Sequence, residues 1–305
     1  MNSERFPRTV QHETKLRACP ACADAAGHNL RSVHCGRPAA SIQDALWRAE
    51  STLGRVSVVL IVVDQFRYDY LTRFSDLFSA RGIGRLKREG ASWVDANYDH
   101  VPTYTAPGHA TLMTGAWPSE TGIIANDWYD PASEKKITSV TDDDTLLLGG
   151  RPDQKGKSPR RLLCSTIGDE LRLVSNDRSK VIGISAKDRS AILPAGRHAN
   201  AAYWFSTDNG NMVSSNYYFN QVPQWVTNFN QSRLVDKWFG AHWDRLLSSE
   251  DQYLKRAGKD NVPWENQDKS SNDTNYFPHV VTGGADKRRQ SLLSRSITRR
   301  SPTIY

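Results

Sequence analysis

The pattern of hydrophobic and polar positions changes three times along this 305-residue chain. Residues 1–54 are polar and show no sustained period, so we expect a disordered extension there. Residues 55–285 alternate between continuous apolar runs and amphipathic stretches, which indicates a folded domain. Residues 286–305 are rich in Arg and Ser and lack an apolar period, so we expect a disordered basic tail.

Two continuous apolar runs predict strands that are buried on both faces. The run from Arg55 to Val63 is mostly β-branched and ends at Asp64, and the run from Lys180 to Ala186 ends at Lys187. Central strands of parallel sheets have this uninterrupted apolar character. Residues 91–98 are compatible with one further strand.

Amphipathic stretches between these runs predict helices. We expect a mostly helical segment over residues 68–89, a helix that begins near Pro107, and a helix over residues 159–174 with its apolar side chains on one face. Residues 201–218 predict an inserted hairpin, and residues 224–247 are amphipathic and rich in Trp. This alternation favours an α/β fold with a parallel sheet.

Candidate catalytic residues follow the predicted strands. Ligands of α/β folds bind beyond the carboxyl ends of the strands, where Asp64 and Lys187 fall. Thr105 lies at a turn before a helix, and Asn126 follows it by 21 residues. An acid that holds a divalent metal, a hydroxyl that the metal activates and an amide that steadies an oxyanion form a phosphoryl-transfer site. Lys187 and Arg189 fit a phosphate clamp.

Structural roles compete with each of these interpretations. Asp64 alone is typical of a helix cap, Asn126 of a turn and a Lys-x-Arg pair of a solvated surface. Their joint placement around Thr105 favours the phosphate site. We interpret His109 as a buried structural histidine rather than a ligand, and the pair Gly108–His109 as a tight packing site between turn and helix.

Charge and cysteine content narrow the other functions. The formal net charge is +7, but six Lys or Arg stand against one Asp in the last twenty residues, so the body is nearly balanced. This balance is weak support for nucleic-acid binding. Cys19 and Cys22, followed by His28, His34 and Cys35, supply one arm of a zinc-finger spacing. We favour a disordered extension over a zinc module there. A nucleic-acid binder built on this segment and the basic tail stays an alternative, although aromatic and basic residues do not interleave.

Five segments of the chain resemble the alkaline phosphatase superfamily. They are Val62–Leu71, Pro102–His109, Thr114–Ile123, Asn126–Asp130 and Ser185–Arg189. The nearest resemblance is to the phosphate-irrepressible alkaline phosphatases, which share a core with the nucleotide pyrophosphatase/phosphodiesterases. The resemblance implies an alkaline-phosphatase-like α/β domain, of which this chain supplies the N-terminal part.

The resemblance also implies roles for the site residues. Asp64 would be a ligand of one of two zinc ions, and Thr105 would be the metal-activated nucleophile that becomes phosphorylated. Asn126, Lys187 and Arg189 would hold the phosphoryl oxygens. The implied activity is zinc-dependent hydrolysis of small phosphate monoesters through a phosphothreonine intermediate, with a phosphodiesterase or nucleotide pyrophosphatase as the alternative.

Several departures from the family pattern predict an impaired enzyme. The family's remaining zinc ligands come from a later Asp-x-x-x-His segment and an Asp-His pair, and neither follows Thr105 here. The one Asp-His pair, Asp99–His100, precedes the nucleophile. We therefore expect less than one zinc per chain, and a non-catalytic fragment or weak phosphate binder is the competing interpretation. Family members are usually periplasmic or secreted, but the first fifty residues show no apolar segment of a signal peptide, and no run reaches the ~18 apolar residues of a membrane span.

Overall fold

The computed structural model describes residues 56–151, 154–238, 240–261 and 276–281. Contacts between Cα atoms divide the chain into two units, residues 1–62 and residues 63–305, and each is described by itself. The predictions for residues 1–54, with their cysteine cluster, and for the basic tail lie outside the described residues.

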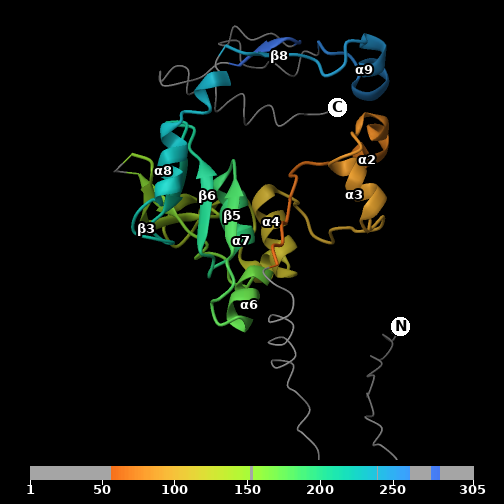
Figure 1. The fold of residues 1–305 in the computed structure, drawn as a ribbon. Coiled ribbons are helices and arrows are strands. Elements are labelled where there is room, and N and C mark those ends of the chain that lie inside the picture. Colours follow the sequence, from red (N-terminus) through yellow and green to blue (C-terminus); the bar gives the residue numbers. More distant parts are fainter. Residues whose placement is uncertain (1–55, 152–153, 239, 262–275, 282–305) are drawn as a thin grey trace, which may run out of the picture. The chain divides into compact units, whose positions relative to one another are not determined.

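The second unit is built on a five-stranded mixed sheet with the strand order β4-β3-β7-β6-β5 (Figure 1). The strands are β3 Thr141–Leu148, β4 Lys155–Lys157, β5 Ile182–Ser185, β6 Ala201–Phe205 and β7 Met212–Ser215. β5 and β6 pair in parallel, and the other neighbours pair antiparallel. The predicted α/β class is therefore confirmed, and the sheet is mixed rather than parallel throughout. The hairpin predicted over residues 201–218 is β6–β7, which lies within the central sheet.

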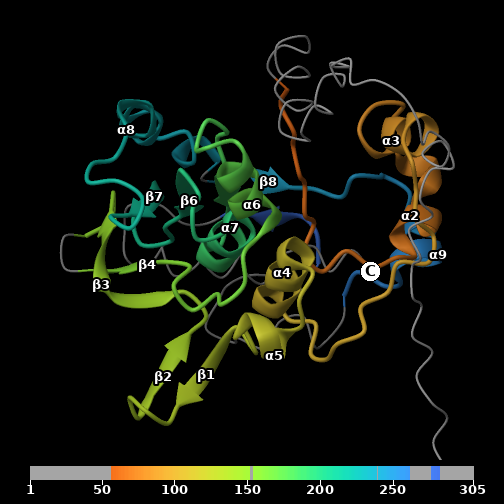
Figure 2. The same ribbon diagram turned by 90° about the horizontal axis from the view of Figure 1, so that it is seen from below.

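Helices pack on both faces of this sheet (Figure 2). α7 Asp188–Ala195 lies on one face and α8 Gln224–Gln231 on the other. α4 Thr105–Thr114 and α6 Ile167–Val174 pack against α7, and α5 Pro118–Thr121 packs against α4. α7 packs against β5, β6 and α4, whereas α8 packs against β7. The predicted helix near Pro107 is confirmed as α4. It ends at Thr114, and the capping residue Gly115 has the left-handed conformation that glycine adopts without strain.

β6 is buried on both faces because its alternate residues enter two apolar clusters. Ala202 and Trp204 belong to a cluster with Ile192 of α7, and Ala201 and Tyr203 belong to a cluster with Val226 of α8. The two-residue alternation of a strand thus supplies both layers of the core.

α6 begins later than the sequence predicted because a strong cap forms at Thr166. Its hydroxyl accepts the backbone N–H of Asp169 at 3.1 Å, while the Asp169 carboxylate accepts the N–H of Thr166 at 2.9 Å. Such a reciprocal capping box fixes the first residue of a helix. The same carboxylate accepts the N–H groups of Arg197 and His198 at 3.2 and 2.6 Å. It therefore joins α6 to the loop that follows α7.

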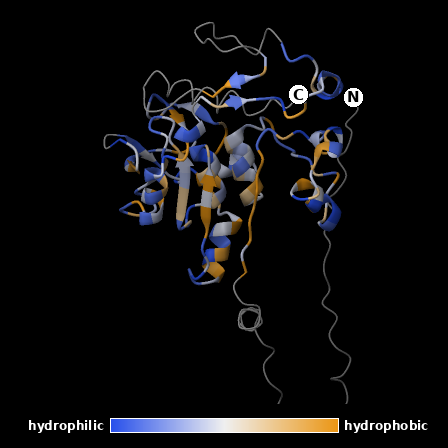
Figure 3. Cartoon of the chain, turned by 45° about the horizontal axis from the view of Figure 1, so that its top comes forward, coloured by the Kyte–Doolittle hydropathy of each residue, from blue (hydrophilic) through white to orange (hydrophobic). Residues whose placement is uncertain are grey.

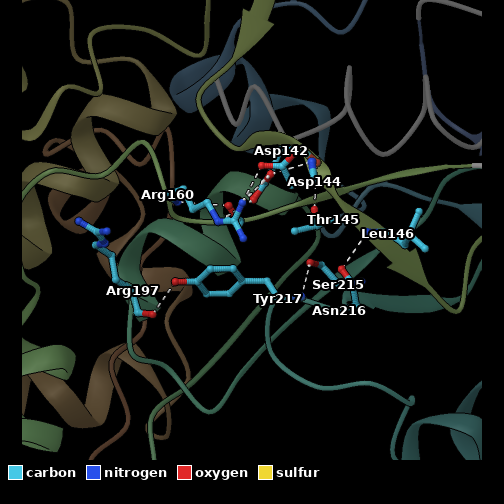
Figure 4. A network of polar contacts seen from close by, with 10 residues as sticks. Asp142, Asp144, Thr145, Leu146, Arg160, Arg197, Ser215, Asn216 and Tyr217 are labelled. Atoms are coloured by element: carbon cyan, nitrogen blue, oxygen red, sulfur yellow. Dashed lines mark hydrogen bonds and ion pairs between the residues drawn. The ribbon is translucent and has the colours of Figure 1, made fainter.

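A second polar network holds the β3–β4 corner (Figure 4). Arg160 pairs with the buried carboxylate of Asp142 at 3.3 Å and with Asp144 at 3.1 Å. Its guanidinium lies 5.8 Å from the ring centre of Tyr217, whose hydroxyl donates to the carbonyl oxygen of Arg197 at 2.8 Å. Burial raises the pKa of Tyr217. The hydroxyl therefore stays a donor, and this network is structural in character.

The remaining elements are short. They are α2 Tyr70–Arg73, η1 Ser75–Leu77, α3 Ile83–Glu89, the hairpin β1 Asp127–Asp130 with β2 Lys135–Thr138, η2 Asp236–Trp238, α9 Glu250–Ala257, and β8 His242–Trp243 paired with β9 His279–Val280. The segment predicted as mostly helical over residues 68–89 is thus three short helical pieces. None of the helices in the described ranges is long and apolar enough to cross a membrane.

Two strand predictions are wrong in the described structure. Residues 56–63 and 91–98 form no strand, although the first run is strongly apolar (Figure 3). The apolar side chains from Val56 to Val63 are 37–86% exposed. A strand requires a hydrogen-bonded neighbour, and within the described ranges neither segment has one.

Candidate active site

The structure brings the side chains of Asp64 and Thr105 together. The Thr105 hydroxyl donates a hydrogen bond to Oδ2 of Asp64 at 2.8 Å, and Oδ1 of Asp64 accepts the N–H of Gln65 at 3.0 Å. Asp64 is not a helix cap, since α2 begins at Tyr70 and its capping residue is Asp69. This pair supplies an oriented hydroxyl at the first residue of α4.

Asn126 lies at the same helix terminus, with a fixed orientation. Its side-chain oxygen accepts the backbone N–H of Ala106 at 2.8 Å, and its own carbonyl oxygen accepts the N–H of Ser139 at 3.0 Å. Because a backbone N–H only donates, the amide oxygen must face Ala106. Within the described ranges the Nδ2 hydrogens of Asn126 have no acceptor, which leaves them for a ligand at the start of α4.

The first turn of α4 leaves a single backbone donor for a ligand. Pro107 has no N–H, the N–H of Ala106 is taken by Asn126, and that of Gly108 bonds to Tyr104 at 2.9 Å. The N–H of Thr105 has no acceptor within the described part of the chain. Helix N-termini favour anions. In α4 the backbone N–H that can bind an anion is that of Thr105, the candidate nucleophile.

Lys187 and Arg189 lie together where β5 meets α7. Lys187 is the residue that precedes α7, and Arg189 lies in its first turn, 3.9 Å from the carboxylate of Asp188. Burial, and then the charge of Arg189, lower the pKa of Lys187. The Nε of Arg189 is buried without a hydrogen-bond partner in the described residues. Two cations opposed by one nearby acid favour an anionic ligand.

The predicted site residues thus form two groups. One hydrogen-bonded group contains Asp64, Thr105 and Asn126, and the other contains Lys187 and Arg189. No hydrogen bond or ion pair among the described residues joins the groups; the packing of α4 on α7 brings their elements together.

His109 is buried as predicted, and it has a contact that sequence reasoning missed. Its Nδ1 lies 2.7 Å from the carbonyl oxygen of Thr105, and the residue is 5% exposed. Because that partner only accepts, Nδ1 carries the proton. The spacing of four residues within a helix was the signal available in the sequence. Gly108 differs from the prediction, because a Cβ added there meets no atom within 4 Å beyond its chain neighbours and its own helix backbone, so it is not a tight packing site in the described structure.

The described residues do not form a complete zinc centre. Asp64 and Thr105 contribute one carboxylate and one hydroxyl, whereas catalytic zinc takes about three protein ligands. No group of three or more His, Cys, Asp or Glu side chains gathers in the described ranges. The donor set of the described residues therefore does not fit the two zinc ions that the resemblance implies.

The sequence profile of the family described as type I phosphodiesterase / nucleotide pyrophosphatase matches residues 58–287. The chain belongs to this family of phosphoric ester hydrolases. It is 37% identical to the alkaline phosphatase PhoV of Synechococcus elongatus over 264 residues, which are 86% of this chain and 47% of PhoV.

The chain is also similar to solved structures of an alkaline phosphatase. The crystal structure of the alkaline phosphatase PafA matches with a TM-score of 0.68 and 36% identity, over 76% of this chain and 43% of PafA. A PafA variant with one threonine, one asparagine, one lysine and one arginine replaced matches with a TM-score of 0.67 and 34% identity, over 78% of this chain and 44% of that one. The chain thus spans less than half the length of these relatives.

Proposed function

We propose that this chain carries the phosphoryl-binding half of a phosphate monoesterase, with Thr105 as the nucleophile. The observation that carries the proposal is the hydroxyl of Thr105, held by Asp64 at 2.8 Å beside an asparagine whose amide is locked by the helix terminus. The hydroxyl oxygen attacks phosphorus as its proton passes to Asp64, the bond to the leaving oxygen breaks, and the leaving oxygen takes a proton from water and departs as an alcohol. A water molecule then hydrolyses the phosphothreonine, which releases inorganic phosphate and returns the free hydroxyl.

Each neighbouring residue has a separate role in this proposal. The hydrogen bond to Asp64 directs the hydroxyl proton toward the carboxylate, so that an oxygen lone pair can face phosphorus. Nδ2 of Asn126 and the N–H of Thr105 donate to a non-bridging oxygen, and loss of one such donor typically costs ~3 kcal/mol of transition-state stabilisation. Lys187 and Arg189 neutralise the remaining charge.

Residue spacing in a solved relative supports this assignment. In the PafA variant, the replaced threonine and asparagine are 21 residues apart, and the replaced lysine and arginine are two residues apart. Thr105 and Asn126 are also 21 residues apart, and Lys187 and Arg189 are also two apart. The same four residue types therefore recur at matching separations within each pair.

A monoester is the favoured substrate because the site offers two cations. A phosphate monoester carries a second charge that a diester lacks, and the pair Lys187 and Arg189 complements it. The family profile keeps phosphodiester or nucleotide pyrophosphate hydrolysis as a second candidate. Comparing an aryl phosphate monoester with the corresponding diester distinguishes them, since replacing Lys187 by Gln should reduce turnover of the monoester more.

We further propose that the isolated chain holds less than one zinc at Asp64 and Thr105 and that its turnover is slow. Phosphate monoester hydrolysis is among the slowest uncatalysed reactions, and positioning alone supplies only part of the acceleration. A non-catalytic phosphate binder is the corresponding alternative. Elemental analysis of a full-length variant with Cys19, Cys22 and Cys35 replaced by Ser tests the zinc content, and two tightly held ions would contradict it.

The nucleophile is tested by trapping the intermediate. The chain is incubated with an aryl phosphate and added zinc, quenched in acid and digested, and we expect the phosphate on the peptide that contains Thr105. Thr105→Ser should retain labelling and Thr105→Ala should abolish it. Phosphate on another residue, or hydrolysis that survives Thr105→Ala, would show that the nucleophile is wrong. No label and no turnover would favour the non-catalytic alternative.

Asn126 offers a matched pair of variants. Asn126→Asp keeps an oxygen for the N–H of Ala106 but replaces the Nδ2 donor by a negative charge, whereas Asn126→Ala removes both. We expect both variants to lose phosphate binding, and only Asn126→Ala to loosen the start of α4. Phosphate titration and hydrogen exchange of α4 measure the two effects separately.

A further inference from the structure

Gly108 is the one glycine in the described ranges for which the structure gives no reason. The other described glycines have a positive φ or lie where an added Cβ comes within 3.0 Å of a neighbouring atom. Gly108 has neither feature, because its φ is helical and an added Cβ has no atom within 4 Å beyond its chain neighbours and the backbone of its own helix. Glycine in a helix interior is disfavoured relative to alanine. A functional reason is therefore needed for its presence in α4.

The position of Gly108 on α4 relates it to Thr105. Residues three apart lie on the same face of a helix, and Cα–Cβ bonds tilt toward the helix N-terminus. A side chain at position 108 therefore covers the surface over the preceding turn. That surface holds the Thr105 hydroxyl and its free N–H. The buried face of the helix is different and contains Ala106, His109 and Ala110.

We propose that Gly108 keeps the approach to Thr105 open and that the space beside it receives the transferred phosphoryl group. This inference rests on the proposed function of Thr105. In an in-line attack the leaving group lies opposite the nucleophile, so the atoms that pass alongside α4 are the equatorial oxygens of the phosphoryl group. Gly108 is thus a residue that determines which groups fit beside the nucleophile.

Accessibility can be measured without any catalytic turnover. A Thr105→Cys variant is alkylated with iodoacetamide, in which sulfur bonds to carbon, iodide leaves and the thiol proton goes to water. The modified peptide is followed by mass spectrometry, so the native cysteines do not interfere. The reaction is compared in three backgrounds, namely Gly108, Gly108→Ala and Gly108→Leu. Leu112→Ala, one turn further along α4, is the control.

We expect Gly108→Leu to slow the alkylation by about a hundredfold, since a misplacement of ~1 Å can already cost that much. Gly108→Ala should have a smaller effect and Leu112→Ala none. A larger maleimide reagent should be slowed more than iodoacetamide, whereas an altered thiol pKa would slow both equally. Ala and Leu are good helix formers, so hydrogen exchange of α4 should not accelerate in either Gly108 variant. Equal alkylation rates in all backgrounds, or faster exchange of α4, would overturn the proposal.

Inorganic phosphate identifies the occupant. Phosphate should protect the Thr105→Cys thiol when position 108 is glycine, and this protection should weaken with Gly108→Leu. If Gly108→Leu slows the alkylation but phosphate does not protect the Thr105→Cys thiol, the space beside Gly108 does not receive a phosphoryl group. The trapping experiment tests the proposed function separately, which fails if no phosphate is found on Thr105. If Thr105 is labelled equally with Gly108 and with Gly108→Leu, the role of Gly108 alone is overturned.

Discussion

Replacing Asp169 by Asn tests whether one buried carboxylate joins α6 to the loop after α7. Asp169 is 4% exposed. Its Oδ2 accepts the N–H and hydroxyl of Thr166 at 2.9 and 3.0 Å and the N–H of Arg197 at 3.2 Å, and its Oδ1 accepts the N–H of His198 at 2.6 Å. An amide has a single oxygen, so it cannot accept all four bonds in this geometry.

The cost follows from the bonds that Asn cannot make. With the amide oxygen at the Oδ2 position, the NH₂ group faces the N–H of His198, and one charge-assisted bond is lost. Hydrogen bonds to charged groups contribute ~1.5–3 kcal/mol, so we expect Asp169→Asn to destabilise the fold by about 2–3 kcal/mol. Asp169→Ala leaves several buried donors unpaired and should cost about 4–5 kcal/mol, at ~1–3 kcal/mol each. Either loss is large beside a typical stability of ~5–15 kcal/mol.

Hydrogen exchange gives the most direct measurement, because it reports on the donor amides themselves. The amide of His198 should exchange faster in Asp169→Asn, since that of Arg197 keeps its acceptor at the Oδ2 position, and the urea midpoint followed by Trp fluorescence should fall. Asp177→Asn is the matched control, since its 75% exposed carboxylate pairs with Arg172 at 2.7 Å. Such a pair contributes ~0–1 kcal/mol. Unchanged exchange at His198, or equal effects of both variants, would refute the reasoning.

Three further predictions concern the charge of Lys187, the hydrogen bonds between Asn230 and strand β7, and zinc binding. Burial and the charge of Arg189 lower the pKa of Lys187, so phosphate affinity should fall as the pH rises through that lowered pKa, before an ordinary lysine loses its charge; in phosphate titrations across pH, Lys187→Arg should remove this alkaline loss and Arg189→Gln should move it to higher pH. The side-chain amide of Asn230 accepts the N–H of Met212 and donates to its carbonyl oxygen, both at 2.9 Å; Asn230→Ala should cost about 1–3 kcal/mol in urea unfolding, and an unchanged midpoint would count against this role. Added zinc should raise the thermal stability of the chain only slightly, because stabilisation grows with the logarithm of ligand concentration over Kd and an incomplete donor set binds zinc weakly. A large zinc-dependent shift that Asp64→Ala abolishes would contradict the incomplete donor set.

The sequence was informative about the site wherever a local signal set the geometry. The turn before Pro107 predicted the start of α4, and Thr105 is its first residue. Asp64 directly follows the apolar run, and its contact with Thr105 spans 41 positions in sequence. Asp64 and Thr105 were expected to be close because both were interpreted as parts of one phosphoryl-transfer site. Helix and strand propensities alone do not predict that contact. The bond between Asn126 and Ala106 was not predictable, since no local pattern pairs a loop amide with a helix N–H twenty residues earlier.

Helix lengths were less predictable because caps compete with apolar periodicity. The apolar positions of residues 159–174 suggested one helix, but the reciprocal bonds of Thr166 and Asp169 start α6 at Ile167. Capping residues also occur where no helix begins, so their effect depends on the donors that tertiary structure brings to them. Here those donors include the amides of Arg197 and His198, which no local pattern connects with Asp169.

The exposure of β5 shows why apolar composition identifies a strand but not its cover. Ile182 and Ile184 are 56% and 65% exposed, although the run from Lys180 to Ala186 reads as doubly buried. In the parallel register they lie beside Ala201 and Tyr203 of β6. Val226 of α8 packs on that face of β6 but does not extend over β5. The opposite face of β5 is closed by α7, where Gly183 lies too close to Ala191 for any side chain. Burial of one face of β5 therefore depends on how far α8, a helix much later in the sequence, extends over the sheet. The local pattern of apolar residues does not contain that information.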